Sequence, residues 1–238
     1  MELVSHALTQ AGRAHVVNED SFFADDGRGL YVLSDGVGRY RGAATASRCV
    51  VESVTAALRD FDAGDARRAL QGAVKKAATA LARVSAETKQ SSMAATLTLA
   101  QVRGGELGLA HVGDSRAYSW RHGSFERLTR DHSLAFEQYE AGAITREQLR
   151  DHPNQKLLTR TLRGSSTFVV PDFAVRRVLS GDRYLLCTDG LTKALPDDRI
   201  AELVGSSSDP VAIGRSLLDG ANRAGSDDDV TVIIFIVK

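Results

Sequence analysis

Four short acidic turns border apolar runs of this chain, and their carboxylates are the groups best suited to chemistry. The turns are Asp35-Gly36, Gly113-Asp114, Asp189-Gly190 and Asp227–Asp229. Carboxylates that are buried alone cost far more free energy than a fold supplies, unless they are paired or bound to a metal ion. Buried strands that end in carboxylates therefore indicate one shared cation site, and they predict a metal-dependent enzyme.

The acidic residues come from distant parts of the sequence, so only the edge of a sheet can gather them. The set is Asp20, Asp35, Asp114, Asp189 and Asp228. Hard oxygen ligands without a His/Cys set favour Mg²⁺ or Mn²⁺ over zinc. Two metal ions about 3.5–4 Å apart convert a shared water to hydroxide and clamp the oxygens of an in-line displacement. A phosphoryl group is the electrophile that suits this arrangement best.

Each acidic turn also has a structural interpretation. Asp-Gly is above all a hairpin turn pair, and Asp20 could simply cap a turn. A calcium-binding structural domain is another alternative, but no contiguous oxygen-rich loop supplies most of a calcium shell. Only the joint pattern of the turns favours catalysis.

Composition and length predict a single globular domain over residues 1–238. Hydrophobic residues make up 43% and charged residues 25%, and the formal net charge is zero. Nothing in this balance favours bulk attraction to nucleic acid or to anionic membranes. Cys49 and Cys187 lie in apolar stretches and do not form a Cys-x-x-Cys pair, which is typical of core thiols in a reducing compartment. The N-terminus resembles no signal peptide, and no apolar run could span a membrane, so a cytoplasmic location is expected.

Runs of strands and runs of helices alternate along the chain, which predicts an α+β sandwich and not repeated βαβ units. Strands are expected at residues 22–23, 30–34, 95–102, 107–112, 117–121, 167–175, 184–188 and 230–237. Helices are expected at residues 43–61, 65–89, 197–204 and 210–224. The last strand is continuously apolar and should lie inside a sheet covered on both faces. Residues 131–155 change to short polar helical pieces, which predicts a flap over the rim of the core.

A series of motifs in a fixed order resembles one known family. The motifs are Asn18-Glu-Asp-Ser, Asp35-Gly-Val-Gly, Ala95-Thr-Leu-Thr, Gly113-Asp-Ser-Arg-Ala-Tyr, Leu128-Thr-Arg-Asp-His-Ser, Leu158-Thr-Arg-Thr-Leu, Gly181-Asp-Arg-Tyr-Leu-Leu-Cys-Thr-Asp-Gly-Leu and Asp228-Asp-Val-Thr. From about residue 8 to the C-terminus, the chain resembles the metal-dependent protein phosphatases of type 2C, and most of all their bacterial serine/threonine branch. Any one motif is weak, but eight in order are highly specific.

This resemblance implies a fold and a pair of core ions. The fold would be a four-layer αββα sandwich, with two antiparallel sheets flanked by helices and the metals at one end. Asp35 would bridge two Mn²⁺ or Mg²⁺ ions, and the carbonyl of Gly36 would bind the second. Asp189 and Asp228 would complete the shell of the first, so that Asp35, Asp189 and Asp228 form the catalytic set.

The resemblance also implies ligands around this core. Glu19 and Asp20 would hold metal-bound waters. Asp114 would serve a third, weaker ion. The expected reaction is hydrolysis of phosphoserine and phosphothreonine on proteins by a metal-bridging hydroxide. The expected partners are phosphorylated proteins, opposite a serine/threonine kinase, and the expected state is a monomer.

The sequence departs from the family pattern where the substrate phosphate would bind. His15 stands where the family usually has an Arg, and a neutral His cannot form the two-donor fork of a guanidinium. Arg13 would share a strand face with position 15 if this segment is extended. Arg39 could replace the missing phosphate contact or block the site. These departures, together with Tyr40, leave open an alternative: a phosphatase-fold binding or regulatory module with weak or no catalysis.

The proton donor to the leaving group is not assigned by the sequence. Eukaryotic members of the family carry a His two residues after the bridging Asp, where this chain has Val37. His132 and His152 lie in the expected flap and are candidate donors. His111 lies inside an apolar strand and is expected to be a hydrogen-bonded core residue.

Overall fold

Two antiparallel sheets form the centre of the molecule. The computed structural model describes residues 1–13, 16–38, 42–59, 65–150 and 152–238. The first sheet has the strand order β1-β12-β11-β7-β8. Its strands are β1 (Leu3–Gln10), β12 (Val230–Val237), β11 (Arg183–Cys187), β7 (Arg116–Arg121) and β8 (Ser124–Arg127). Every residue of β12 is buried, as expected for a strand that pairs on both edges and is covered on both faces.

The second sheet has the strand order β10-β6-β5-β3-β2. Its strands are β10 (Asp172–Arg177), β6 (Glu106–Val112), β5 (Leu97–Arg103), β3 (Leu30–Asp35) and β2 (Asp20–Asp25). A two-stranded ribbon joins β4 (Ala94–Ala95) to β9 (Leu162–Arg163). The alternation of β5 separates its two faces, because Leu97 and Leu99 face the helices whereas Ala100 and Val102 face the other sheet.

An aromatic stack fills the space between the two sheets. Phe235 of β12 stacks on Tyr31 of β3, with the ring centroids 4.0 Å apart, and lies 5.0 Å from the ring of Tyr184 of β11. Aliphatic residues from both sheets complete this inter-sheet core. The stack therefore joins strands that are far apart in sequence.

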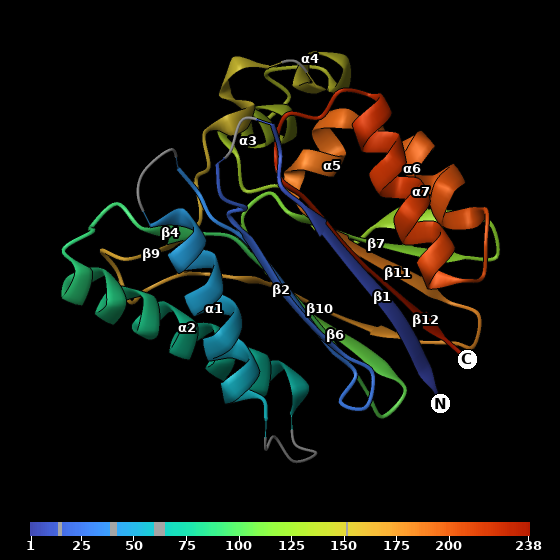
Figure 1. The fold of residues 1–238 in the computed structure, drawn as a ribbon, viewed down its shortest axis with the longest axis horizontal. Coiled ribbons are helices and arrows are strands. Elements are labelled where there is room, and N and C mark those ends of the chain that lie inside the picture. Colours follow the sequence, from blue (N-terminus) through green and yellow to red (C-terminus); the bar gives the residue numbers. More distant parts are fainter. Residues whose placement is uncertain (14–15, 39–41, 60–64, 151) are drawn as a thin grey trace.

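Helices cover the outer face of each sheet, so the four-layer αββα sandwich is confirmed (Figure 1). On the second sheet lie α1 (Ala43–Ala57) and α2 (Ala66–Thr88). On the first sheet lie α5 (Asp189–Ala194), α6 (Asp197–Gly205) and α7 (Pro210–Arg223). The two helical layers each bury an apolar cluster against their sheet.

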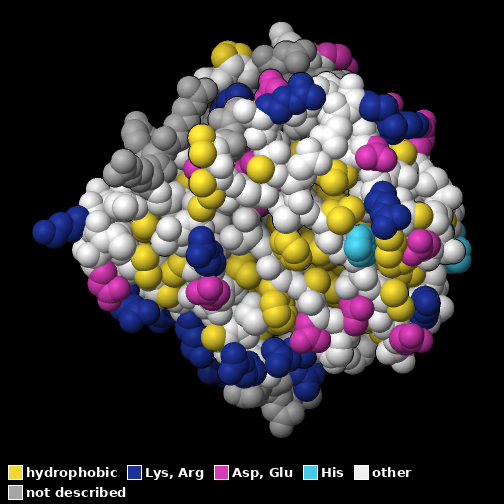
Figure 2. All heavy atoms as spheres, in the orientation of Figure 1, with side chains coloured by type: hydrophobic (Ala, Val, Ile, Leu, Met, Phe, Trp, Pro, Cys, Tyr) yellow, Lys and Arg dark blue, Asp and Glu magenta, His cyan; other side chains and the backbone are white. Residues whose placement is uncertain are grey.

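The helix α2 shows how sequence periodicity sets this packing. Its N-cap is Asp65, whose side chain accepts a hydrogen bond from the backbone N–H of Arg68, and its C-cap is Lys89 in the left-handed conformation. The apolar stripe is buried, and the opposite face carries exposed basic residues. Figure 2 shows Lys and Arg side chains gathered along the lower edge of the molecule, where α1 and α2 lie in Figure 1.

The segment predicted as a flap consists of short helices at one end of the sandwich. They are α3 (Leu134–Glu140), α4 (Arg146–Arg150) and the 3₁₀ turn η1 (Pro153–Lys156). Backbone hydrogen bonds close the segment at its base, from Leu134 N to Leu157 O at 2.9 Å and from Thr159 N to His132 O at 2.9 Å. In Figure 1 these helices lie near α5 and the start of β12.

Several elements differ from the expected ones. The strand expected at residues 167–175 begins only at Asp172, because Phe168 and Val170 are exposed in the preceding loop. The helix expected at residues 43–61 ends at Ala57. The helix α5 has no counterpart among the expected elements. The described residues contain no helix with both the length and the apolar surface that a membrane crossing demands.

Candidate metal centre

Asp20 and Asp35 face each other at the end of one strand pair. They are directly opposite partners in the register of β2 and β3. One oxygen of Asp20 accepts hydrogen bonds from the hydroxyls of Thr188, at 2.9 Å, and Thr231, at 2.6 Å. Thr231 belongs to β12 and Thr188 directly follows β11, so Asp20 joins the two sheets at the acidic end.

Hydrogen bonds fix the backbone around Asp35. Its N–H donates to the hydroxyl of Thr96 at 2.9 Å, and the N–H of Thr96 donates to the carbonyl of Asp35 at 2.8 Å. The N–H of Gly36 donates to the carbonyl of Glu19 at 3.1 Å. A Cβ at position 36 would lie only 2.3 Å from the carbonyl oxygen of Ala43, so this approach requires glycine.

A close backbone contact brings Asp189 to the start of β12. Asp189 is the first residue of α5. A Cβ at Gly190 would lie 2.1 Å from the carbonyl oxygen of Asp229, and the hydroxyl of Ser226 donates to the carbonyl of Gly190 at 3.0 Å. Asp189 is thereby held beside the turn that carries Asp228.

Asp229 has a structural role that its position in the sequence did not reveal. Its carboxylate is buried and accepts hydrogen bonds from the N–H of Gly12 at 2.8 Å and of Glu19 at 2.7 Å. Two backbone donors can satisfy a buried carboxylate. Asp229 therefore ties the segment before β2 to the start of β12, which positions Glu19 next to the acidic residues.

The turn that carries Asp114 is joined to the base of the flap. Gly113 has a φ of 116°, and a Cβ there would lie 2.5 Å from a methyl carbon of Thr96. The N–H of Gly113 donates to Nδ1 of His132 at 3.1 Å, and the N–H of His132 donates to the carbonyl of Gly113 at 2.8 Å. The flap and the Asp114 turn thus share one anchor.

The electrostatics show that the five aspartates form one cluster. Burial raises the pKa of Asp35 well above its usual range, and the charges of Asp20, Asp189, Asp114 and Asp228 raise it further. Burial, against the hydrogen bonds of its two threonine partners, raises the pKa of Asp20 to about 7. Burial also raises the pKa of Asp114, with Asp189 as the largest charge contribution. This concentration of negative charge favours the binding of cations.

The donor set fits divalent metal ions with hard oxygen ligands. The second carboxylate oxygen of Asp20 is buried and has no hydrogen-bond partner among the described atoms, so it is available to a cation or its water. Among these same residues, no three His, Cys, Asp or Glu side chains already stand as a metal-binding group. The centre is therefore a set of neighbouring carboxylates and not a preformed cage.

A lysine lies among the acidic side chains, and the sequence motifs did not point to it. The ammonium of Lys193 in α5 forms ion pairs with the carboxylates of Asp189 and Asp228, the latter at 2.9 Å. Its positive charge also acts on Asp114, where it opposes the effect of burial on the pKa. Lys193 thus supplies positive charge to the cluster.

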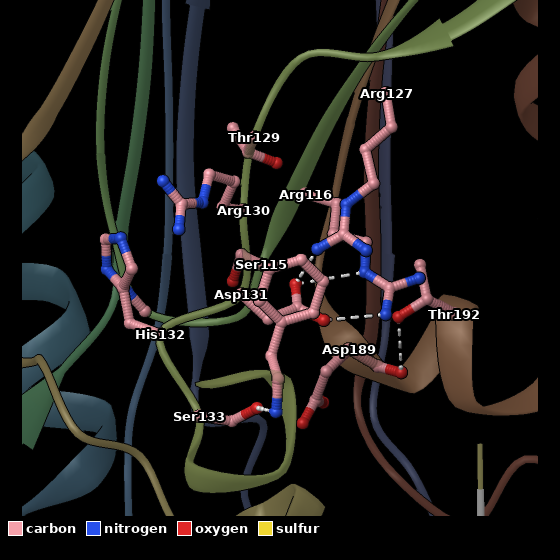
Figure 3. A network of polar contacts seen from close by, with 12 residues as sticks. Ser115, Arg116, Arg127, Thr129, Arg130, Asp131, His132, Ser133, Asp189 and Thr192 are labelled. Carbon is pink, nitrogen blue, oxygen red and sulfur yellow. Dashed lines mark hydrogen bonds and ion pairs between the residues drawn. The ribbon is translucent and has the colours of Figure 1, made fainter. Parts of the chain in front are cut away.

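A buried network of arginines flanks the centre (Figure 3). Arg116 contacts both oxygens of Asp131, with Nε–Oδ1 and Nη2–Oδ2 distances of 3.1 and 2.7 Å, and Arg127 forms an ion pair with the same carboxylate. Although burial acts in the opposite direction, these two positive charges hold the pKa of Asp131 below its usual range. Figure 3 shows Asp189 beside this network, which therefore borders the centre.

The histidines are engaged in structural contacts. Nε2 of His111 lies 3.0 Å from the carbonyl oxygens of both Gly113 and Arg130, and burial lowers the pKa of His111 to about 3. The prediction of a core histidine is confirmed. His132 is buried as well. Its Nδ1 accepts the hydrogen bond from Gly113, and its Nε2 lies 3.2 Å from a carboxylate oxygen of Asp172. These contacts disfavour His132 as a proton donor.

His152 has a structural contact, and the residues expected to bind phosphate are Arg13, His15 and Arg39. The side chain of His152 caps η1 by accepting a hydrogen bond from Asn154 N at 3.2 Å. Arg13 is exposed in a turn beyond the end of β1, so the extended segment on which its shared face with position 15 depends does not reach it. His15 and Arg39 lie outside the described residues.

Comparison with known proteins gives a family match over most of the chain. The model of the family described as Protein phosphatase 2C matches residues 9–212. The serine/threonine protein phosphatase PstP of Mycobacterium tuberculosis is 34% identical over 229 residues, which cover 96% of this chain and 44% of that protein. The chain thus spans less than half the length of this relative.

A shorter relative and a solved structure match along nearly their whole length. The serine/threonine phosphatase stp of Listeria monocytogenes is 29% identical, over 95% of this chain and 92% of that protein. A crystal structure of the catalytic domain of the serine/threonine protein phosphatase PstP in complex with two manganese ions superimposes with a TM-score of 0.90 at 33% identity. That alignment covers 100% of this chain and 99% of the other.

Proposed function

Because the chain belongs to the protein phosphatase 2C family, we propose that it hydrolyses phosphoserine and phosphothreonine on proteins with divalent metal ions. One observation carries the proposal: Asp20, Asp35, Asp114, Asp189 and Asp228 come together at one end of the sandwich. The names of the bacterial relatives support the substrate class. The two manganese ions in the PstP structure support the requirement for metal.

The roles proposed for the acidic residues follow from the family resemblance. Asp35, whose pKa is raised by the charges of the other four aspartates, would bridge two core ions, with the carbonyl of Gly36 on the second. Asp189 and Asp228 would complete the first. When bound, such ions activate a water for attack on phosphorus and neutralise the oxygens of the phosphoryl group.

Glu19, Asp20 and Asp114 would act around the two core ions, by holding water or a further ion. Glu19 is positioned by the hydrogen bond from its N–H to Asp229, and Asp20 by its two threonine donors. Both would hold waters of the core ions. Asp114 would serve a third ion. Mn²⁺ and Mg²⁺ both suit this oxygen-rich set.

The proposal extends to the setting in which the protein acts. Residues 1–238 would form a single phosphatase domain that acts as a monomer on phosphorylated proteins, opposite a serine/threonine kinase. The free thiols of Cys49 and Cys187 support a reducing, cytoplasmic location. The flap at residues 131–155 would contribute to substrate selection, since it borders the acidic end.

Replacing the central carboxylate tests the proposal. We expect Asp35→Asn to lower turnover on a phosphothreonine peptide by at least roughly a hundredfold, because an amide cannot bridge two cations as a carboxylate does. Steady-state release of phosphate in saturating Mn²⁺ measures the effect. Asp219→Asn, on an exposed part of α7, is the control and should keep the wild-type rate.

Two results would contradict the proposal. Wild-type turnover by Asp35→Asn would exclude the assigned centre. A wild-type protein that binds Mn²⁺ in calorimetry, yet hydrolyses neither the phosphopeptide nor an aryl phosphate, would favour the binding or regulatory module instead.

A further inference from the structure

Lys193 connects two carboxylates that belong to different segments. Its ammonium lies 2.9 Å from a carboxylate oxygen of Asp228 and forms a second ion pair with Asp189, one helical turn earlier in α5. The side chain of Lys193 is 30% exposed, and that of Asp189 is 15% exposed. This contact is more than a surface pair within a helix, because Asp228 enters from the start of β12.

The position of this ammonium conflicts with metal binding. Asp189 and Asp228 are the carboxylates that we assign to the first core ion. A divalent cation that takes both as ligands competes with Lys193 for the same oxygens, and like charges at this distance repel each other.

We propose that Lys193 is a tethered counter-ion of the metal centre, which neutralises Asp189 and Asp228 while the ions are absent and is displaced when they bind. The inference rests on the proposed function, because it takes these two carboxylates as metal ligands. Lys193 is thus a positioning residue that weakens metal affinity and protects the empty centre from its own charge. The ion pairs of Lys193 therefore stabilise the metal-free protein and lower its affinity for metal.

Calorimetry and thermal melting of metal-stripped protein test the inference. We expect Lys193→Gln to bind Mn²⁺ on the order of tenfold more tightly than the wild type, because no cation must first leave. The variant should also melt at a lower temperature in chelator and show a larger rise in melting temperature with Mn²⁺. Lys193→Arg keeps the charge and should stay near the wild type. Lys76→Gln, on the exposed face of α2, controls for a change in net charge.

Labelling of the wild-type protein gives a second readout that needs no variant. An amine-acylating reagent should modify Lys193 slowly in chelator, where the ammonium is paired, and several-fold faster in saturating Mn²⁺. Mass spectrometry reports both Lys193 and Lys76, and the rate at Lys76 should not change with metal.

The outcomes separate this inference from the proposed function. If the wild type binds Mn²⁺ and Lys193→Gln binds it with equal or lower affinity, the counter-ion role is wrong but the metal centre stands. An equal change in Lys76→Gln, or labelling of Lys193 that does not rise with Mn²⁺, also overturns it. If neither the wild type nor Lys193→Gln binds Mn²⁺, both the inference and the proposed function fail.

Discussion

The surroundings of Asp20 lower the stability of the metal-free fold. Its carboxylate is buried and shares its neighbourhood with Asp189 and Asp229, and only one of its oxygens has hydrogen-bond donors. An isolated buried charge of this kind is costly unless a cation offsets it. The residue is therefore explained by what it would hold and not by what it contributes to folding.

Asp20→Asn is expected to stabilise the metal-free protein in a manner that depends on pH. The folded pKa of Asp20 is about 7, above the ordinary value of 3.8 for an aspartate, so the cost of Asp20 is absent below the lower value. This cost grows as the pH rises and is complete above the higher value. In chelator at pH 8 we expect the variant to melt at least about 3 °C higher than the wild type, with a smaller difference at pH 5.

Melting curves in chelator and in Mn²⁺ distinguish this effect from general stabilisation. In Mn²⁺ the advantage of Asp20→Asn should vanish or reverse, because the variant loses the group that we propose holds metal-bound water. An equal gain at pH 5 and pH 8 would show that the charge of Asp20 is not its cause.

At the scale of elements, contacts between α5 and the start of β12 set the distance between Asp189 and Asp228. Gly190→Ala would drive a Cβ against the carbonyl oxygen of Asp229, a backbone atom that cannot move alone. We expect a loss of about 1–3 kcal/mol in the free energy of unfolding. Calorimetry should also find weaker Mn²⁺ binding, because the two carboxylates move apart.

Gly72→Ala is the matched control for this substitution. Gly72 lies on the exposed face of α2, and a Cβ there meets nothing within 4 Å. Alanine inside a helix is favoured over glycine, so we expect a gain of about 0.5–1 kcal/mol with unchanged Mn²⁺ affinity. Equal losses in the two variants would contradict the steric argument.

The sequence predicted the long amphipathic elements well and the short ones poorly. The helix α2 was expected at residues 65–89 and is Ala66–Thr88, because several turns of periodic apolar residues define a buried stripe. The helix α5 spans only six residues, too few to display such a stripe. The strand β10 was placed too early, since an apolar run resembles a strand whether or not it pairs.

The sequence predicted the part of the candidate site that local motifs carry, and it missed the part that depends on contacts between distant segments. Carboxylates at the ends of apolar runs predicted the convergence of Asp35, Asp114, Asp189 and Asp228. Their individual roles as ligands came from the family resemblance and stay predictions. The contacts of Lys193 and Asp229 carry no local sequence signal, because each depends on segments that meet only in the folded chain.

At the scale of the whole molecule, the aromatic stack that stabilises the contact between the sheets lies away from the acidic residues. Phe235 contacts Tyr31 and Tyr184 near the far end of β12, whereas Asp228 precedes the first residue of this strand. The strand therefore anchors the two sheets with one end and the metal centre with the other.

Phe235→Ala should lower the free energy of unfolding by about 3–5 kcal/mol, because it removes a fully buried ring from between the sheets. Denaturant titration measures this loss. The Mn²⁺ affinity of the folded variant should match that of the wild type in calorimetry. A loss below roughly 1 kcal/mol would show that the stack is dispensable, and weaker Mn²⁺ binding would show that the two ends of β12 are coupled.

The pairing of β1 with β12 also has a practical consequence. Leu3 lies opposite Val237 and Gln10 lies opposite Val230, so the two ends of the described chain emerge together. One strand length, roughly 25 Å, separates them from the carboxylates. A biotin or an affinity handle attached at either end would immobilise the protein on a sensor chip with its acidic cluster turned toward the solution.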